Sequence, residues 1–293
     1  MIKKILALTD FSENALHAAL YACKLANVVN AESVTLLHTF APSALLSPNE
    51  MSSLLAPVEA TGIFTNYEWA AEQIETIRKE NTEELEKLRD QLLGEVNSNI
   101  QINCRVESSS LVRAVNLICK QESIDQVVMG IKGRTGIEKA LIGSNATKAI
   151  EYLNYPLIIV PQGAPLTIPE SIVIATNLRQ IPEEPLAKLS KLLNSLKIKI
   201  FAVHAFNKKQ DINEIKKKAA PIQQQLIKYS AEFHFVPTDD IEASINQFAI
   251  DHKASMIISL HQVKNFVNSL FHKSITKRLA WHSKIPLMVI NLK

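Results

Sequence analysis

The chain has 293 residues, enough for about two domains of ordinary size. Hydrophobic residues make up 47% of it and charged residues 21%, so each half can bury a core. The net charge of +3 is too small to indicate nucleic-acid binding, and no apolar run approaches the ~18 residues of a membrane span. The start of the chain lacks the pattern of a signal peptide. The three cysteines stand among apolar residues, which indicates buried reduced thiols in a cytoplasmic protein.

The first half alternates apolar strand patterns with helical patterns. The expected strands cover residues 2–9, 33–40, 100–106, 127–129 and 156–161. Helices are expected after Ser12, from Tyr67 to about Leu93, over residues 110–121 and from about Gly143. Residues 42–65 contain prolines and little periodicity, which predicts a loop. Strands that alternate with helices indicate a parallel sheet with helices on both faces.

The same pattern restarts in the second half, which indicates an internal duplication. Residues 171–177 repeat residues 4–10, and residues 285–290 repeat residues 155–160. We align residues 255–259 with residues 126–130. The boundary is expected in the proline-containing stretch 162–170, which gives domains of 1–163 and 170–293. The sequence therefore predicts an α/β protein with two tandem doubly wound, Rossmann-like units, each a five-stranded, mostly parallel sheet flanked by helices.

The stretch from residue 124 to residue 150 contains the strongest indication of a ligand. Two glycines follow a short apolar strand, and a Gly-Ser pair stands where the next helix begins. Glycine lets the backbone approach a ligand, and the free N–H groups of a helix N-terminus favour an anion. Neither GxGxxG nor a Walker A sequence is present. The predicted phosphate contacts are Gly130, Gly133, Gly143, Ser144, Lys132 and Arg134.

The spacing Gly-x2-Gly-x9-Gly-Ser resembles the nucleotide motif of the ATP-binding branch of the universal stress protein family. Other pieces stand in the order of that family: a strand before Thr-Asp-Phe-Ser-Glu, a strand ending Leu-Leu-His-Thr, and a last strand Pro-Leu-Ile-Ile-Val. The resemblance covers essentially the whole chain as two fused copies. It implies a cytoplasmic stress-response protein that binds an adenine nucleotide, ATP with or without Mg²⁺, in its first domain only.

The resemblance also implies roles for individual residues. Asp10 would accept from the ribose hydroxyls or hold a metal ion, and Thr9 would line the same edge. Asp10 could instead only cap the turn into the first helix. Thr39 would meet the adenine through its backbone, and Met129 would pack on the nucleotide. Gly130 and Gly133 would wrap the phosphate turn, and Gly143, Ser144 and Asn145 would donate to the phosphates.

The second copy predicts no nucleotide site. Its aligned positions hold other residues, namely Asn177, Ser259, Gln262, His272 and Lys273, and no glycine follows Gly163. Family members pair through their last strand, so the two copies are expected to pair within one chain, which leaves a homodimer open. His38 and His204 are interpreted as hydrogen-bonded residues at strand ends. The histidines of the last stretch match no standard zinc spacing.

Three functions stay open. The first is a nucleotide-sensing or interaction module. The second is a slow ATPase or phosphotransferase, although the sequence assigns no general base and no arginine finger. The third is a nucleotide-free scaffold that binds a protein or a small apolar ligand. No catalytic residue and no metal ligand set is assigned.

Overall fold

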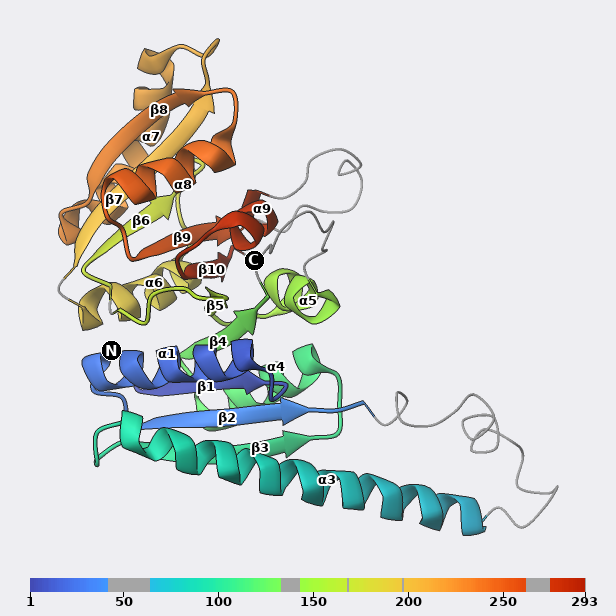
Figure 1. The fold of residues 1–293 in the computed structure, drawn as a ribbon. Coiled ribbons are helices and arrows are strands. Elements are labelled where there is room, and N and C mark those ends of the chain that lie inside the picture. Colours follow the sequence, from blue (N-terminus) through green and yellow to red (C-terminus); the bar gives the residue numbers. More distant parts are fainter. Residues whose placement is uncertain (42–63, 133–142, 168, 197, 262–274, 293) are drawn as a thin grey trace.

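The computed structural model describes residues 1–41, 64–132, 143–167, 169–196, 198–261 and 275–292 (Figure 1). The elements of the first half are β1 (Lys4–Thr9), α1 (Glu13–Val29), β2 (Ser33–Thr39), α3 (Phe64–Leu92), η2 (Leu93–Glu95), β3 (Gln101–Glu107), α4 (Leu111–Glu122), β4 (Gln126–Ile131), α5 (Ser144–Tyr152) and β5 (Leu157–Pro161). The predicted loop at 42–65 lies outside the described residues except at its end, where α3 already begins.

The second half repeats this order of strands and helices. Its elements are β6 (Ser171–Ala175), α6 (Glu183–Ser195), β7 (Lys199–Asn207), α7 (Ile212–Leu226), η3 (Ile227–Tyr229), β8 (Glu232–Thr238), α8 (Ile241–Asp251), β9 (Met256–His261), α9 (Ile275–His282) and β10 (Leu287–Asn291). In the turn after β5, Gly163 has a φ of +70°, a conformation that favours glycine.

The strands form one ten-stranded sheet in the order β3-β2-β1-β4-β5-β10-β9-β6-β7-β8. Neighbouring strands are parallel, except that β5 and β10 are antiparallel. Each half thus has the order of a doubly wound unit, which confirms the predicted fold class. At the junction, Leu157 lies opposite Val289 and Ile159 opposite Leu287. This pairing covers a strand edge that each half would otherwise expose.

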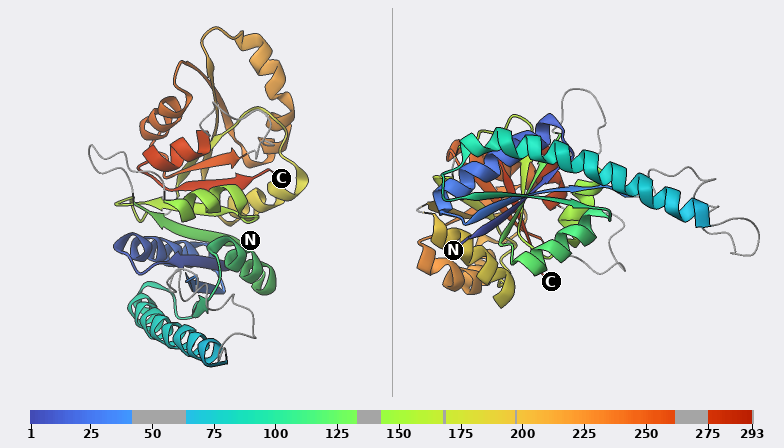
Figure 2. Two further views of the ribbon diagram at one scale, coloured as in Figure 1. Left: turned by 90° about the vertical axis from the view of Figure 1, so that its right-hand side faces the viewer. Right: turned by 90° about the horizontal axis from the view of Figure 1, so that it is seen from below.

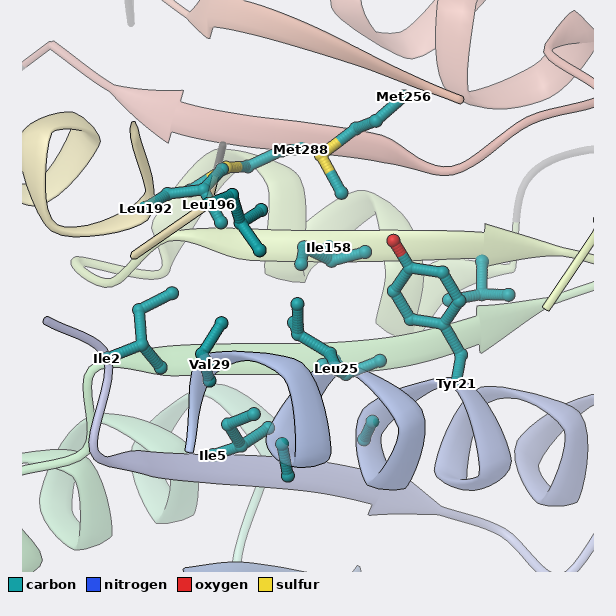
Figure 3. Close-up of a cluster of buried hydrophobic side chains, with 14 of the residues drawn as sticks. Ile2, Ile5, Tyr21, Leu25, Val29, Ile158, Leu192, Leu196, Met256 and Met288 are labelled. Atoms are coloured by element: carbon teal, nitrogen blue, oxygen red, sulfur yellow. The ribbon is translucent and has the colours of Figure 1, made fainter. Parts of the chain in front are cut away.

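Helices cover both faces of the sheet, and each helical layer runs across both halves (Figure 2). One buried cluster joins the sheet to α1, α3, α6 and α7, and another joins it to α4, α5, α8 and α9. In the first cluster, Leu25 of α1 and Leu192 of α6 lie on either side of Ile158 in β5, near Met288 of β10 (Figure 3). All four side chains are buried, and each such burial contributes about 1.5–3 kcal/mol. The same hydrophobic layer therefore stabilises both halves.

The strand register corrects our alignment of the two halves by one residue. Ile5 of β1 lies opposite Gln126 of β4, and Ile172 of β6 lies opposite Met256 of β9. Since Ile5 and Ile172 hold the same place in matching strands, Met256 corresponds to Gln126, and Ser255 does not. The alignment was wrong because β4 and β9 are apolar runs buried on both faces, where no alternation of polar residues sets the register.

The correction moves the position that matches each glycine. Leu260, and not Ser259, corresponds to Gly130, because the same one-residue shift runs through the whole strand. The last helices show the same shift, because Leu153 N–H donates to the Ala149 carbonyl in one half and Ser283 N–H to the Leu279 carbonyl in the other. Residues 262, 272 and 273 lie outside the described residues.

Candidate functional site

The strand order reverses between β1 and β4, and the predicted site lies at their carboxyl ends. The helix after β1, α1, packs on one face of the sheet, and α4, which precedes β4, packs on the other. In such sheets the crevice at this reversal is where ligands bind. Thr9 ends β1, and Gly130 and Ile131 end β4, so these residues share one edge of the sheet (Figure 1).

The turn from β1 into α1 is built by side chains that accept from its backbone. Thr9 Oγ1 accepts from Phe11 N–H at 3.0 Å, and Asp10 Oδ1 accepts from Ser12 N–H at 3.1 Å. Phe11 adopts a φ of 62°, and Ser12 caps α1 by accepting from Ala15 N–H at 3.2 Å. Asp10 therefore shapes the turn, while its exposed carboxylate has acceptor capacity beyond this one bond.

His38 links β2 to this turn. Its Nδ1 donates to the Thr9 carbonyl at 3.0 Å, and its ring stacks on Phe11 with centroids 4.5 Å apart. This confirms the interpretation of His38 as a hydrogen-bonded residue at a strand end. Next to it, Thr39 lies opposite Glu107 in β3 and ends β2 at the same edge as Thr9. Phe11 was not predicted as part of the site, although it belongs to the Thr-Asp-Phe-Ser sequence.

Gly130 lies inside β4, which corrects the prediction that it forms a turn. It pairs with Val160 of β5, and a Cβ built on it would lie 2.2 Å from the carbonyl oxygen of Asn14 in α1. Glycine is needed here because α1 begins in direct contact with the strand. Met129, one residue earlier, is half-buried, and Lys132, just after the strand, is exposed.

The start of α5 supplies donors at the same edge. Gly143 is the N-cap and contributes no side chain, and Ser144 and Asn145 are exposed in the first turn. The first N–H groups of a helix have no acceptor within the helix, which favours an anion beside them. Gly143 has a φ of −51°, and no described atom lies within 4 Å of a Cβ built on it. The other predicted phosphate contacts, Gly133 and Arg134, lie outside the described residues.

The second half repeats the turn but not its surroundings. Thr176 Oγ1 accepts from Leu178 N–H at 3.0 Å, Leu178 has a φ of 66°, and His204 donates to the Thr176 carbonyl at 2.8 Å. However, Leu260 stands in the place of Gly130. Counted from the matching threonine, α6 begins three residues later than α1. Ile181 in this longer connection and Leu260 in β9 are both buried.

Metal and thiol chemistry receives no support from the described residues. No group of three histidine, cysteine, aspartate or glutamate side chains among them could hold a metal ion. Cys23, Cys104 and Cys119 are free; Cys23 and Cys119 are buried as predicted, whereas Cys104 is half-buried. Burial raises the pKa of Cys23 and Cys119 to about 12, so both thiols stay protonated and unreactive near neutral pH.

A polar hollow of about 620 Å³ lies at the opposite edge of the first half, at the amino ends of β1, β2 and β3. Its carboxylates already pair with cations: Glu32 with Lys3 at 2.7 Å, and Glu122 with Arg105 at 2.8 Å. Ligands of doubly wound sheets bind at the carboxyl ends of the strands. We therefore place the candidate site at the edge that contains Thr9 and α5.

Comparison with known proteins agrees with the fold. The model of the universal stress protein family matches residues 1–161. The chain belongs to this family. A relative of this chain is universal stress protein MJ0577 of Methanocaldococcus jannaschii, 28% identical over 164 residues that cover 55% of this chain and 95% of that protein.

Solved universal stress protein structures also match the whole length of the chain. One from Archaeoglobus fulgidus DSM 4304 has a TM-score of 0.64 at 14% identity and covers 99% of this chain and 98% of its own. A structure described as that of a universal stress protein from Pseudomonas aeruginosa UCBPP-PA14 has a TM-score of 0.55 at 11% identity and covers 99% and 93%. At these identities the likeness concerns the fold alone. Among the described helices of this universal stress protein, none could cross a membrane.

Proposed function

We propose that the first unit, residues 1–163, binds ATP at the carboxyl ends of β1 and β4, and that the protein is a nucleotide-sensing or interaction module of the cytoplasmic stress response. The observation that carries the proposal is the exposed start of α5, which has Gly143 as its N-cap. The φ of Gly143 is ordinary and its surroundings among the described residues are open, so neither its backbone nor packing against those residues requires glycine there. A ligand that closely approaches the start of α5 would require it.

The residues at this edge fit the parts of a nucleotide. Asp10 offers an exposed carboxylate to the ribose hydroxyls or to a magnesium ion that the phosphates also bind. Thr9 and Met129 line the crevice, and Thr39 offers its backbone to the adenine. The phosphates lie against the exposed start of α5 and against charged side chains after β4, with contacts from Gly130, Lys132, Gly133, Arg134, Gly143, Ser144 and Asn145.

The second unit, residues 170–293, serves as support in this proposal and binds no nucleotide. Leu260 fills the position of Gly130, and buried Ile181 lies in the lengthened connection to α6. Because β5 already pairs with β10 in the same chain, a homodimer would need a different surface from this strand edge.

Calorimetric titration of Mg²⁺-ATP into wild type and Gly143→Asp tests the proposal. An aspartate fits the open N-cap position and is a preferred cap, so the variant should fold at least as stably as wild type. Its carboxylate would occupy the N–H groups that a phosphate needs and would repel the phosphate. We expect affinity to fall by at least about tenfold, a change of about 1.4 kcal/mol.

Gly94→Asp is the matched control, because Gly94 is also a glycine with no described atom within 4 Å of a built Cβ. It lies in η2, outside the site, and its affinity should equal that of wild type. No binding by wild type, or equal binding by Gly143→Asp, would contradict the proposal. Steady hydrolysis well above background during the titration would favour the slow ATPase instead.

A further inference from the structure

The end of β10 holds the end of α5, although the two belong to different halves of the chain. Asn291 Nδ2 donates to the Ile150 carbonyl at 3.1 Å and to the Leu153 carbonyl at 2.7 Å. The last carbonyls of a helix have no donor within the helix, so such contacts complete its hydrogen bonding. The side chain of Asn291 is therefore a C-terminal clamp on α5.

A second contact reaches the same end of α5 from α9. Lys277 of α9 forms an ion pair with Glu151, which lies in the last turn of α5. An acidic side chain there is unfavourable beside the negative end of the helix dipole, and α5 has no basic residue in its own last turn. The lysine of the second half supplies that positive charge.

The clamp acts in one direction only. In the strand register, Asn291 corresponds to Pro161 of β5, which has neither an N–H group nor a side-chain donor. The matching position of the first half therefore cannot donate to α9 in the same way. The contact of Asn291 with α5 therefore distinguishes the two halves, although their junction is nearly symmetric.

Because α5 is short, the clamp at its carboxyl end also affects the position of its amino end. The helix has nine residues, a length of about 13 Å, and isolated helices this short are unstable. Two of its three buried residues are alanines, Ala146 and Ala149, which bury little apolar surface. The contacts that Asn291 and Lys277 make at its carboxyl end therefore add to this limited apolar packing. A tilt at Ile150 displaces Gly143 and Ser144 as well.

We propose that the second unit positions α5 through Asn291 and Lys277, and thereby sets the nucleotide affinity of the first unit. The effect on nucleotide affinity rests on the proposed function of Gly143 and Ser144, whereas the contact itself does not. Asn291 is a positioning residue: it does not contact the nucleotide and acts through the helix. It gives the second unit a role in a site to which it contributes no ligand contact.

The test compares Asn291→Ala with Ser195→Ala in the full chain. Asn291→Ala removes two hydrogen bonds between the halves and Ser195→Ala removes one, since Ser195 Oγ accepts from Ile2 N–H at 3.1 Å, but only the first variant touches α5. Mg²⁺-ATP affinity is measured by titration, and opening of residues 144–153 by hydrogen exchange without nucleotide. We expect Asn291→Ala to weaken binding about tenfold and to speed exchange in α5 by a similar factor. Asn291→Gln, which keeps the amide, should restore part of both.

The two readouts separate failure of this inference from failure of the proposed function. If wild type binds no ATP, the nucleotide function is wrong, and exchange alone decides whether Asn291 holds α5. If wild type binds and Asn291→Ala leaves affinity or α5 exchange unchanged, the inference is overturned. Equal effects of Ser195→Ala would also overturn it, because they would show a general loosening of the junction.

Discussion

Gly130 lies where β4 and the first turn of α1 are in closest contact. The structure gives this glycine a packing role that the motif alone does not indicate, since a Cβ there would lie 2.2 Å from a backbone oxygen of Asn14. Gly143 differs in kind, because no described atom crowds it. Packing inside the fold thus requires glycine at position 130, whereas no described packing requires it at position 143 on the surface.

Gly130→Ala should therefore destabilise the fold. The new methyl group can be accommodated only if α1 moves away from β4, which typically costs roughly 1–3 kcal/mol. Urea unfolding measures the change. Gly94→Ala, at an open position, should stay within about 0.5 kcal/mol of wild type. Equal stabilities of the two variants would show that the start of α1 gives way without cost.

At the scale of elements, the sequence predicts well whether a segment is a helix or a strand, but it predicts the register of the strands poorly. The long helix from Tyr67 and the strands ending at Thr9 and Thr39 are recovered within a few residues, because periodicity and capping residues mark them. The register of β9 is missed by one residue, because a strand buried on both faces has no polar alternation. The clamp by Asn291 could not be predicted, because it depends on which strand ends meet at the junction.

One pair of matching elements differs in its charges. In the first half, Arg105 of β3 and Glu122 of α4 form an ion pair at 2.8 Å. The register places His234 of β8 and His252, which follows α8, at the same positions, with ring centroids 5.6 Å apart. An opposite-charge pair is thus replaced by two groups that repel each other when both are protonated.

This replacement predicts loss of stability in mild acid. Burial lowers the pKa of His234 below 6.5, and His252 and Lys199 lower it further, against the opposing effect of Glu232. As the pH falls, His234 therefore takes up a proton at a higher pH in the unfolded chain than in the folded chain. The contribution of His234 is complete above pH 6.5 and is lost as the pH falls through the folded pKa.

The double variant His234→Arg/His252→Glu, which recreates the pair of the first half, tests this. The free energy of unfolding, measured from pH 7 to pH 5, should fall less steeply with pH than in wild type. The difference between the two slopes should correspond to at most about one bound proton. His204, whose pKa burial also lowers, is unchanged and contributes to both slopes. Identical slopes would mean that the histidine pair does not sense pH.

At the scale of the molecule, the two halves form one sheet with shared helical layers. Duplication and fold class follow from the sequence, because the strand-helix alternation restarts and the turn residues recur. The division of labour between the halves depends on particular differences: Leu260 in place of Gly130, and Asn291 in place of Pro161. In the proposed function, these differences place the nucleotide on the first unit and the support of α5 on the second.

The most direct test of this account counts nucleotides on the intact chain. Native mass spectrometry in saturating Mg²⁺-ATP reports how many molecules each chain holds. We predict one nucleotide per chain in wild type and none at the same concentration in Gly143→Asp. A chain that holds none would remove the nucleotide function. A chain that holds two would show that the second unit binds ATP despite Leu260, and would contradict the assignment of roles to the halves.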